Sequence, residues 1–183
     1  MRMPKKNLRK TDGVIRRDAL YAPWRHKYLK AGKRPDCFFC EAAAAERDDV
    51  ARWKEILLVH RDQHNLLILN RYPYIGGHLL VAPLQHTHDL AALKPAANAG
   101  LWELTHRALG ALQSIYEPHG ANIGMNLGKA GGAAVEAHLH MHIVPRWLGD
   151  TNYMFVTADT HMVHGDLEEL WAALRRKFGH PVE

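Results

Sequence analysis

The chain has 183 residues and a mass of 20.8 kDa, the size of one domain with at most a terminal extension. Hydrophobic residues make up 47% of it, enough for one core, but no apolar run reaches the roughly 18 residues of a membrane-crossing helix. Only two cysteines occur, three positions apart, which excludes a disulfide-rich secreted domain. We therefore expect a cytoplasmic protein with no membrane contact.

The net charge of +5 is unevenly distributed along the chain. Residues 1–34 contain 12 lysines and arginines against two aspartates, whereas the remainder is mildly acidic. We interpret residues 1–34 as a basic N-terminal extension and residues 35–183 as the folded domain. Charge runs are usually solvated tails, and the alternative is a segment that attracts phosphorylated ligands or nucleic acid.

The hydrophobic pattern predicts an α+β domain with a mostly antiparallel sheet, a long helix and a C-terminal helix. Proline and glycine pairs mark the boundaries between these elements. In chain order, we expect a strand end and short helix at 37–47, strands at 56–59, 65–69 and 77–83, a helix at 95–116, strands at 121–127 and 137–147, and a helix at 166–178.

Three histidines alternate with apolar residues in the run His138-Leu139-His140-Met141-His142. Successive side chains of a strand point to opposite faces, so a strand would place all three imidazoles on one face, about 6.6 Å apart. Imidazole titrates near neutral pH and can donate, accept, attack or bind a metal. The alternative is an exposed, histidine-rich strand; His60, His64, His161 and His164 lack such a context and are expected at the surface.

The seven residues from His138 to Val144 match the His-φ-His-φ-His-φ-φ signature of the histidine triad (HIT) family, in which φ is apolar. The resemblance extends to the segments 70–73, 77–83, 126–128 and 145–152. Its last part is most similar to diadenosine polyphosphate hydrolases and phosphorylases. The resemblance implies a HIT-like fold, usually a homodimer, that binds small-molecule nucleotides and cleaves them at the α-phosphate.

The resemblance also implies catalytic roles for two histidines. The middle one, His140, would attack phosphorus and become transiently nucleotidylated, as a neutral imidazole with a pKa of about 6.5 can do. His142 would contact the phosphoryl oxygens and assist the leaving group.

The substrate-binding candidates come from three further segments. Asn126 and Gly128 lie in a glycine-rich turn whose backbone N–H groups could approach phosphate, although many such turns only connect strands. By resemblance, Asn126 would contact phosphate or the leaving group and Asn70 the ribose. Phe39 and Leu80 would line the base pocket, although such residues are more often plain core.

Cys37 and Cys40 form a CxxC pair that supplies half of a tetrahedral metal site. Zinc-bearing relatives in the family imply His86 and His138 as the other two ligands. We therefore expect a structural zinc ion and no organic cofactor; two free buried thiols are the alternative.

One position, Met141, bears on which molecule accepts the nucleotidyl group. Phosphorylase and nucleotidyltransferase relatives often have glutamine where this chain has Met141, which favours water and hence a hydrolase. A phosphorylase or nucleotidyltransferase that uses phosphate, and a non-catalytic nucleotide-binding sensor, are the alternatives.

Overall fold

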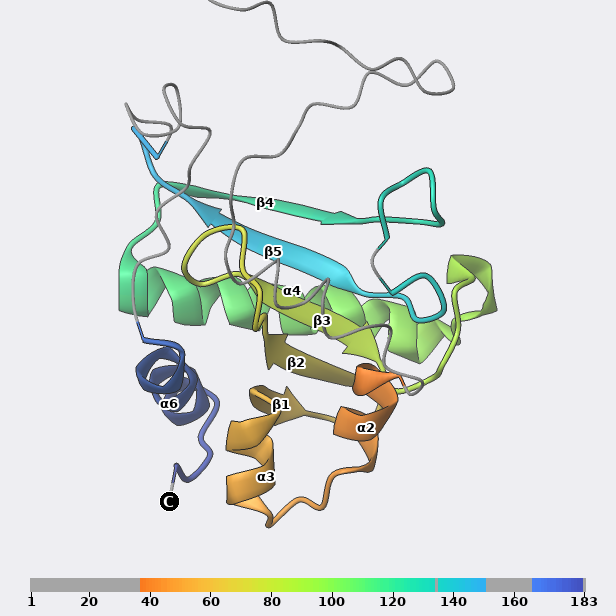
Figure 1. Ribbon diagram of the computed structural model, residues 1–183, viewed down its shortest axis with the longest axis horizontal. Helices are drawn as coiled ribbons and strands as arrows, with labels where there is room; N and C mark the ends of the chain where they lie inside the picture. The colour runs from red at the N-terminus through yellow and green to blue at the C-terminus, as the bar shows by residue number, and fades with distance from the viewer. Residues whose placement is uncertain (1–36, 134, 151–165, 183) are drawn as a thin grey trace, which may run out of the picture.

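The computed structural model describes residues 37–133, 135–150 and 166–182. The predicted extension at 1–34, its boundary with the domain, and His161 and His164 lie outside them. The helices and strands are α2 (Phe38–Ala44), α3 (Val50–Glu55), β1 (Leu58–Arg61), β2 (Asn65–Leu69), β3 (Leu79–Pro83), a 3₁₀ turn (Leu90–Ala92), α4 (Pro95–Tyr116), β4 (Gly120–Met125), β5 (Met141–Arg146) and α6 (Leu167–Lys177) (Figure 1).

The five strands form one sheet in the order β1-β2-β3-β5-β4, and each neighbouring pair is antiparallel (Figure 1). The α+β class, the mostly antiparallel sheet, the long helix and the C-terminal helix are therefore confirmed. Strand β3 lies in the centre of the sheet and all its residues are buried. None of the helices in the described ranges is long and apolar enough to cross a membrane.

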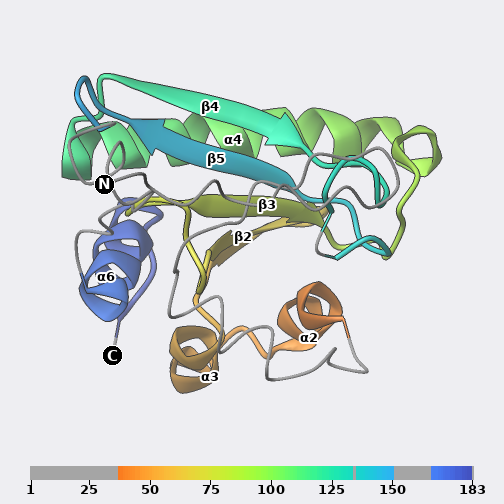
Figure 2. The same ribbon diagram turned by 45° about the horizontal axis from the view of Figure 1, so that its top comes forward.

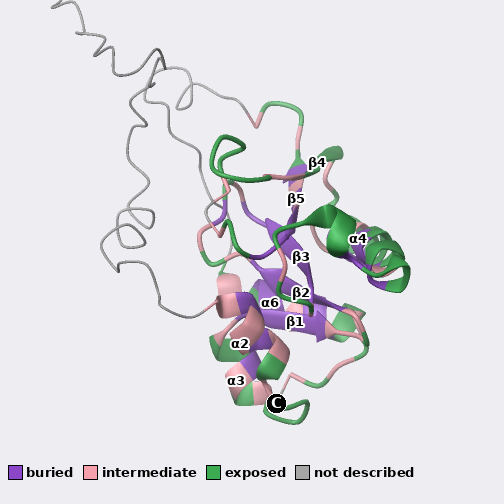
Figure 3. Ribbon diagram, turned by 90° about the vertical axis from the view of Figure 1, so that its right-hand side faces the viewer, coloured by how far each residue is buried: buried purple, intermediate pink, exposed green. Residues whose placement is uncertain are grey.

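Helix α4 covers one face of the sheet, against β2, β3 and β5 (Figure 3). Its apolar residues recur at helical spacing, and Leu101, Leu104 and Leu112 are buried, each contributing roughly 1.5–3 kcal/mol. Pro95 stands in the first turn, where the missing N–H has no helical partner in any case. The Thr105 hydroxyl lies 3.3 Å from the sulfur of Met141, so Met141 points toward α4.

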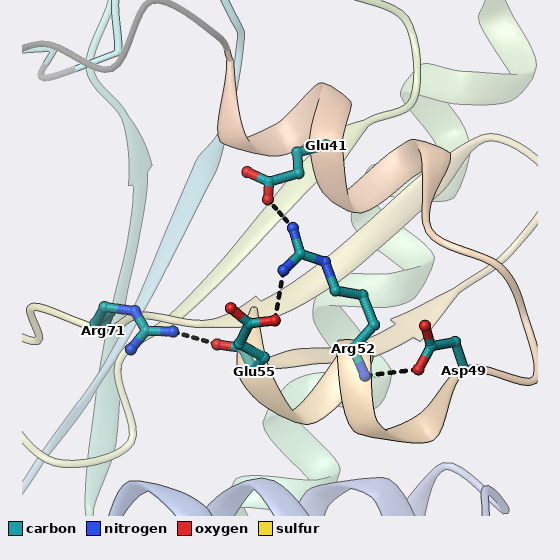
Figure 4. Close-up of polar contacts among 5 residues, drawn as sticks. All are labelled: Glu41, Asp49, Arg52, Glu55 and Arg71. Atoms are coloured by element: carbon teal, nitrogen blue, oxygen red, sulfur yellow. Dashed lines mark hydrogen bonds and ion pairs between the residues drawn. The ribbon is translucent and has the colours of Figure 1, made fainter.

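Helices α2 and α3 lie together near the β1 edge (Figure 2). The guanidinium of Arg52 in α3 binds the carboxylate of Glu41 in α2, and Asp49 caps α3 by accepting from the Arg52 backbone N–H at 2.8 Å (Figure 4). Arg71, from the loop after β2, donates to the backbone carbonyl of Glu55. These contacts tie α2, α3 and that loop into one unit.

Helix α6 packs against β1 through its buried face. The Trp171 indole donates to the carbonyl of Leu58 at 2.9 Å. Next to this contact, His60 is buried and its Nδ1 lies 2.7 Å from Nε2 of His180. The prediction that His60 is a surface residue is therefore wrong, because the segment after α6 covers it.

Strand β5 begins at Met141 and not at residue 137 as predicted. Val81 pairs with Met141, and the same register would place Pro83 opposite Leu139. Proline has no backbone N–H to continue the ladder. The Leu139 N–H instead donates to the carbonyl of Thr87 at 2.7 Å, so His138 and His140 lie just before the strand.

Candidate functional site

The three histidines still share one face, although only His142 belongs to β5. Leu139, Met141 and Ile143 are buried in the core, as expected from the alternation. The rings of His140 and His142 have centroids 4.9 Å apart, closer than the spacing expected for a regular strand, and their planes meet at 64°. They face away from α4.

Phe39 of α2 packs between the first two histidines. Its ring centroid lies 5.0 Å from that of His138 and 5.1 Å from that of His140. Phe39 has no exposed surface. Helix α2 therefore forms a wall beside the triad.

The ring of His140 is held in one tautomer. Its Nδ1 lies 2.9 Å from the carbonyl oxygen of His138, so Nδ1 carries the hydrogen and donates it. In the neutral ring, Nε2 then has a free lone pair. Burial lowers the pKa of His140, although the bond to His138 opposes this, so the ring is uncharged at neutral pH. Such a ring is a competent nucleophile.

His142 is oriented by His78, which directly precedes β3. The backbone N–H of Tyr74 donates to Nδ1 of His78 at 3.2 Å, so the hydrogen of the neutral His78 ring is on Nε2. That Nε2–H donates to Nδ1 of His142 at 2.9 Å. The hydrogen of His142 is therefore on Nε2, a buried atom without a hydrogen-bond partner among the described residues.

Burial keeps both of these rings neutral. It lowers the pKa of His78 to about 3, with a further contribution from the neighbouring His142. Burial likewise lowers the pKa of His142 to about 4. The site thus presents an imidazole lone pair on His140 and an imidazole N–H donor on His142, and both are uncharged.

Sequence reasoning did not assign a role to His78, the residue that orients His142. It was noted only within the segment 77–83. The only signal in the sequence was the position of His78 directly before the apolar run 79–83; the structure adds that it is fully buried.

The structure brings Asn70 and Leu80 close to the triad. Leu80 is directly opposite His142 in the β3–β5 register and is buried. The Asn70 side chain donates to Nδ1 of His78 at 3.1 Å and accepts from the Tyr72 N–H at 2.9 Å. One of the amide hydrogens of Asn70 is thus committed to orienting His78.

Asn126 and Gly128 follow β4, whose last residue, Met125, pairs with Met141. Gly128 has a φ of 64°, which other residues adopt at a cost. The turn closes through the Ala133 N–H, which donates to the Gly128 carbonyl at 3.3 Å. Register places the turn next to the triad, but no contact links Asn126 or Gly128 to the histidines within the described residues.

Cys37, Cys40, His86 and His138 converge at the end of β3, and their donor atoms lie within 4.8 Å of one another. Sγ of Cys37 is 3.2 Å from Nδ1 of His138, and Sγ of Cys40 is 3.1 Å from Nδ1 of His86. Zinc in tetrahedral coordination, with bonds of about 2.0–2.3 Å, separates such atoms by roughly 3.6 Å. The four side chains could hold a metal ion of this kind.

The ring of His138 is prepared for this role. Its Nε2 lies 2.8 Å from the carbonyl of Pro83, so Nε2 carries the hydrogen and Nδ1 presents its lone pair to the sulfurs. Desolvation raises the pKa of the Cys40 thiol, and so do a hydrogen bond and the charge of Cys37. A cation between the two sulfurs would offset this effect and favour the thiolate of Cys40.

The comparisons with known proteins agree with this geometry. The HIT domain family model matches residues 54–147. The AP-4-A phosphorylase of Mycobacterium tuberculosis is 33% identical over 157 residues, which cover 82% of this chain and 80% of that protein. The bis(5'-nucleosyl)-tetraphosphatase [asymmetrical] of Schizosaccharomyces pombe is 26% identical over 60% of this chain and 57% of its own length.

Among solved structures, a Zn-bound histidine triad family protein from Mycobacterium smegmatis superposes with a TM-score of 0.60 at 30% identity. The match covers 79% of this chain and 94% of that one. By its sequence, its fold and the histidines it brings together, this chain belongs to the HIT domain family.

Proposed function

We propose that this chain cleaves dinucleoside polyphosphates, or related nucleotidyl compounds, at the α-phosphate through a covalent intermediate on His140. The single observation that carries the proposal is the hydrogen bond from Nδ1 of His140 to the His138 carbonyl, which leaves Nε2 free to attack. The names of the M. tuberculosis and S. pombe relatives support this class of substrate.

In the first step, Nε2 of His140 forms a bond to the α-phosphorus and the bond to the departing polyphosphate oxygen breaks. The ring becomes cationic, and the His138 carbonyl stabilises its Nδ1–H. The buried Nε2–H of His142 donates a hydrogen bond to the oxygen that departs. No proton transfer is needed, because polyphosphate leaves as an anion. In the second step, an acceptor oxygen forms a bond to phosphorus and the bond to Nε2 breaks, which returns the ring to its neutral form; when the acceptor is water, its proton passes to the solvent.

The remaining residues of the site position the substrate. We assign Leu80 to the base, Asn70 to the ribose, and Asn126 with the backbone at Gly128 to phosphate. Phe39 has no exposed surface and would support the base pocket from behind, not touch the base as the resemblance implied. Residues 35–183 would be the nucleotide-binding catalytic unit. Phosphoryl transfer depends mainly on positioning and charge stabilisation, so these contacts matter as much as the nucleophile.

Two molecules have support as the acceptor of the nucleotidyl group from His140: water and inorganic phosphate. Met141, in place of the glutamine common among transferring relatives, favours water and hydrolysis. The 33% identity to a protein named AP-4-A phosphorylase favours inorganic phosphate. Hydrolysis of diadenosine tetraphosphate yields AMP and ATP, whereas phosphorolysis yields ADP and ATP.

The test is to incubate the protein with diadenosine tetraphosphate, with and without phosphate, and to identify the products. Quenching in alkaline denaturant should trap AMP on the protein, because the bond between histidine nitrogen and phosphorus is stable in base, and peptide mapping at alkaline pH should place it on His140. We expect His140→Ala to abolish both the adduct and turnover, whereas His106→Ala, on the exposed face of α4, should retain both. Turnover by His140→Ala at the wild-type rate would refute the mechanism.

We further propose that Cys37, Cys40, His86 and His138 hold a structural zinc ion. The Zn-bound M. smegmatis neighbour supports this metal, and thiolate ligands suit the reducing cytoplasm in which we place the protein. Zinc would fix α2 against the end of β3; the chemistry itself would belong to the imidazoles.

Metal analysis should find about one zinc per chain. The free energy of binding of a structural zinc ion is about 10–16 kcal/mol, shared among four ligands. Cys40→Ser should therefore weaken zinc binding by about 3 kcal/mol, which is roughly 100-fold in affinity. His88→Ala is the matched control, because His88 is two residues beyond His86 but outside the cluster. Competition with a chelator measures the two affinities, and equal zinc affinities of wild type and Cys40→Ser would exclude this ligand set.

A further inference from the structure

The ring of Tyr74 lies over His78 and His142, the pair to which the proposed mechanism assigns the leaving group. It stacks on His78 with a centroid distance of 4.7 Å and an interplanar angle of 27°, and on His142 at 6.0 Å and 26°. Yet 47% of Tyr74 remains exposed. One face of the ring is therefore supported by imidazoles while the residue keeps a large accessible surface.

The loop that carries Tyr74, between β2 and β3 (yellow in Figure 1), is anchored at several points. The Asn70 N–H donates to the His78 carbonyl at 2.9 Å and closes the loop at its base. The backbone N–H of Tyr74 is bound to His78, and the Arg71 side chain reaches the Glu55 carbonyl (Figure 4). The ring is thus placed before any ligand arrives, so little entropy is lost when it is used.

We propose that the exposed face of Tyr74 is a stacking platform for the nucleobase of the departing nucleotide. This inference rests on the proposed function, since the departing group is the one that His142 contacts. A nucleobase stacked on an aromatic side chain gains affinity through its π-face, whichever base it is. The platform would therefore favour substrates with a second nucleoside and would tolerate different bases at that end.

A ring that only shields the two imidazoles from water would produce the same packing. The two roles differ in substrate dependence. A shield affects every substrate equally, because it acts on His142. A platform affects only a substrate that carries a base beyond the phosphate chain.

The experiment compares diadenosine tetraphosphate with adenosine 5′-tetraphosphate, which has the same adenylyl group and phosphate chain but no second nucleoside. The quantity measured is the ratio of kcat/KM for the two substrates. Tyr74→Ala should reduce this ratio by roughly tenfold, the usual effect of losing one aromatic–base stack. Tyr74→Phe keeps the ring and should restore the wild-type ratio.

Trp102→Ala is the matched control, because Trp102 is an equally exposed aromatic residue on α4, which covers the opposite face of the sheet. It should leave the ratio unchanged. An equal loss with both substrates in Tyr74→Ala, or no loss with either, would overturn the platform.

Equilibrium binding measurements distinguish failure of the platform from failure of the proposed function. If the wild type turns over neither substrate, the proposed reaction fails, and the platform is then tested on affinity alone. Titration with diadenosine tetraphosphate and adenosine 5′-tetraphosphate should still show a preference for the former that Tyr74→Ala removes. Equal affinities of the wild type for the two compounds would overturn the platform.

Discussion

At the scale of single residues, the site depends on which nitrogen of each ring carries the hydrogen. One carbonyl sets His140, and a chain of donors from Tyr74 through His78 sets His142. His78 is therefore a positioning residue, which acts on the substrate through His142.

Replacing His78 tests this role. His78→Phe keeps an aromatic ring but removes the Nε2–H donor, so His142 is free to adopt the other tautomer. We expect kcat to fall by about 100-fold with KM within about twofold, as when one preorganised donor is lost. Gln can both accept from Tyr74 and donate to His142, so His78→Gln should recover part of the rate. Steady-state kinetics of both variants measures this, and an unchanged kcat in His78→Phe would contradict the assignment.

The same residues set the acid limb of the pH profile. A proton on His142 would occupy the lone pair that accepts from His78, and its pKa of about 4 means that this occurs only in acid. We expect kcat to fall as the pH falls, first as the nucleophilic lone pair of His140 is protonated, at a pKa below the ordinary 6.5, and further toward pH 4 as His142 is protonated. A fall centred at or above 6.5, the value of free imidazole, would show that neither ring is desolvated in the working enzyme.

At the scale of helices and strands, the sequence predicted an element well where its signals lie within the element itself. It predicted poorly those ends that depend on a neighbouring strand. Helix α4 begins at Pro95 and ends at Tyr116 as predicted, because its proline, its apolar spacing and Pro118 are all local. The start of β5 was misplaced by four residues, because it depends on Pro83 in another strand. Helix α3 was missed, since six residues carry too little periodicity to recognise.

The docking of the segment after α6 onto β1 predicts acid sensitivity of the fold. The pKa of His60 is lowered to about 4, mainly by burial and further by the charges of Arg107 and His180. The pKa of His180 is also lowered, mainly by burial and further by the charge of Arg175. Below about pH 6.5 the unfolded chain binds protons that the folded one does not, so stability falls as the pH falls toward 4.

Between pH 7.5 and 5, His60 alone should contribute a loss of about 1–2 kcal/mol in the free energy of unfolding, allowing for solvent screening. Urea titrations at the two pH values measure the loss. His60→Phe removes the titrating ring and should reduce the pH difference by that amount, whereas His106→Phe, on an exposed position, should not. Identical pH differences in wild type and His60→Phe would rule out His60 as a source.

At the scale of the whole molecule, the site is assembled from segments that are far apart in the sequence. The CxxC pair and the triad carried enough chemistry to be found separately, and the resemblance implied that His138 belongs to both; the fold shows that its ring reaches the two sulfurs. The partnership of His78 with His142 spans 64 residues and depends on the β3–β5 pairing. Spacing along the chain carries no information about such a contact.

The sheet also has an edge that predicts assembly. Strand β4 pairs only with β5 among the described strands, and all its residues except Met125 are exposed, including Ile123 at 40%. An uncovered edge strand exposes backbone groups that readily pair with another chain. The resemblance to HIT proteins implied a homodimer, and we predict that two copies associate through β4.

Light scattering should therefore give a mass of twice 20.8 kDa. Ile123→Lys places a charge on the edge, one of the devices by which proteins block edge pairing, and should shift the mass to that of one chain. Leu90→Lys is the control, because Leu90 is similarly exposed but lies in the 3₁₀ turn before α4. Circular dichroism must show that both variants remain folded. A wild-type mass of one chain, or a dimer that persists in Ile123→Lys, would place the association elsewhere or exclude it.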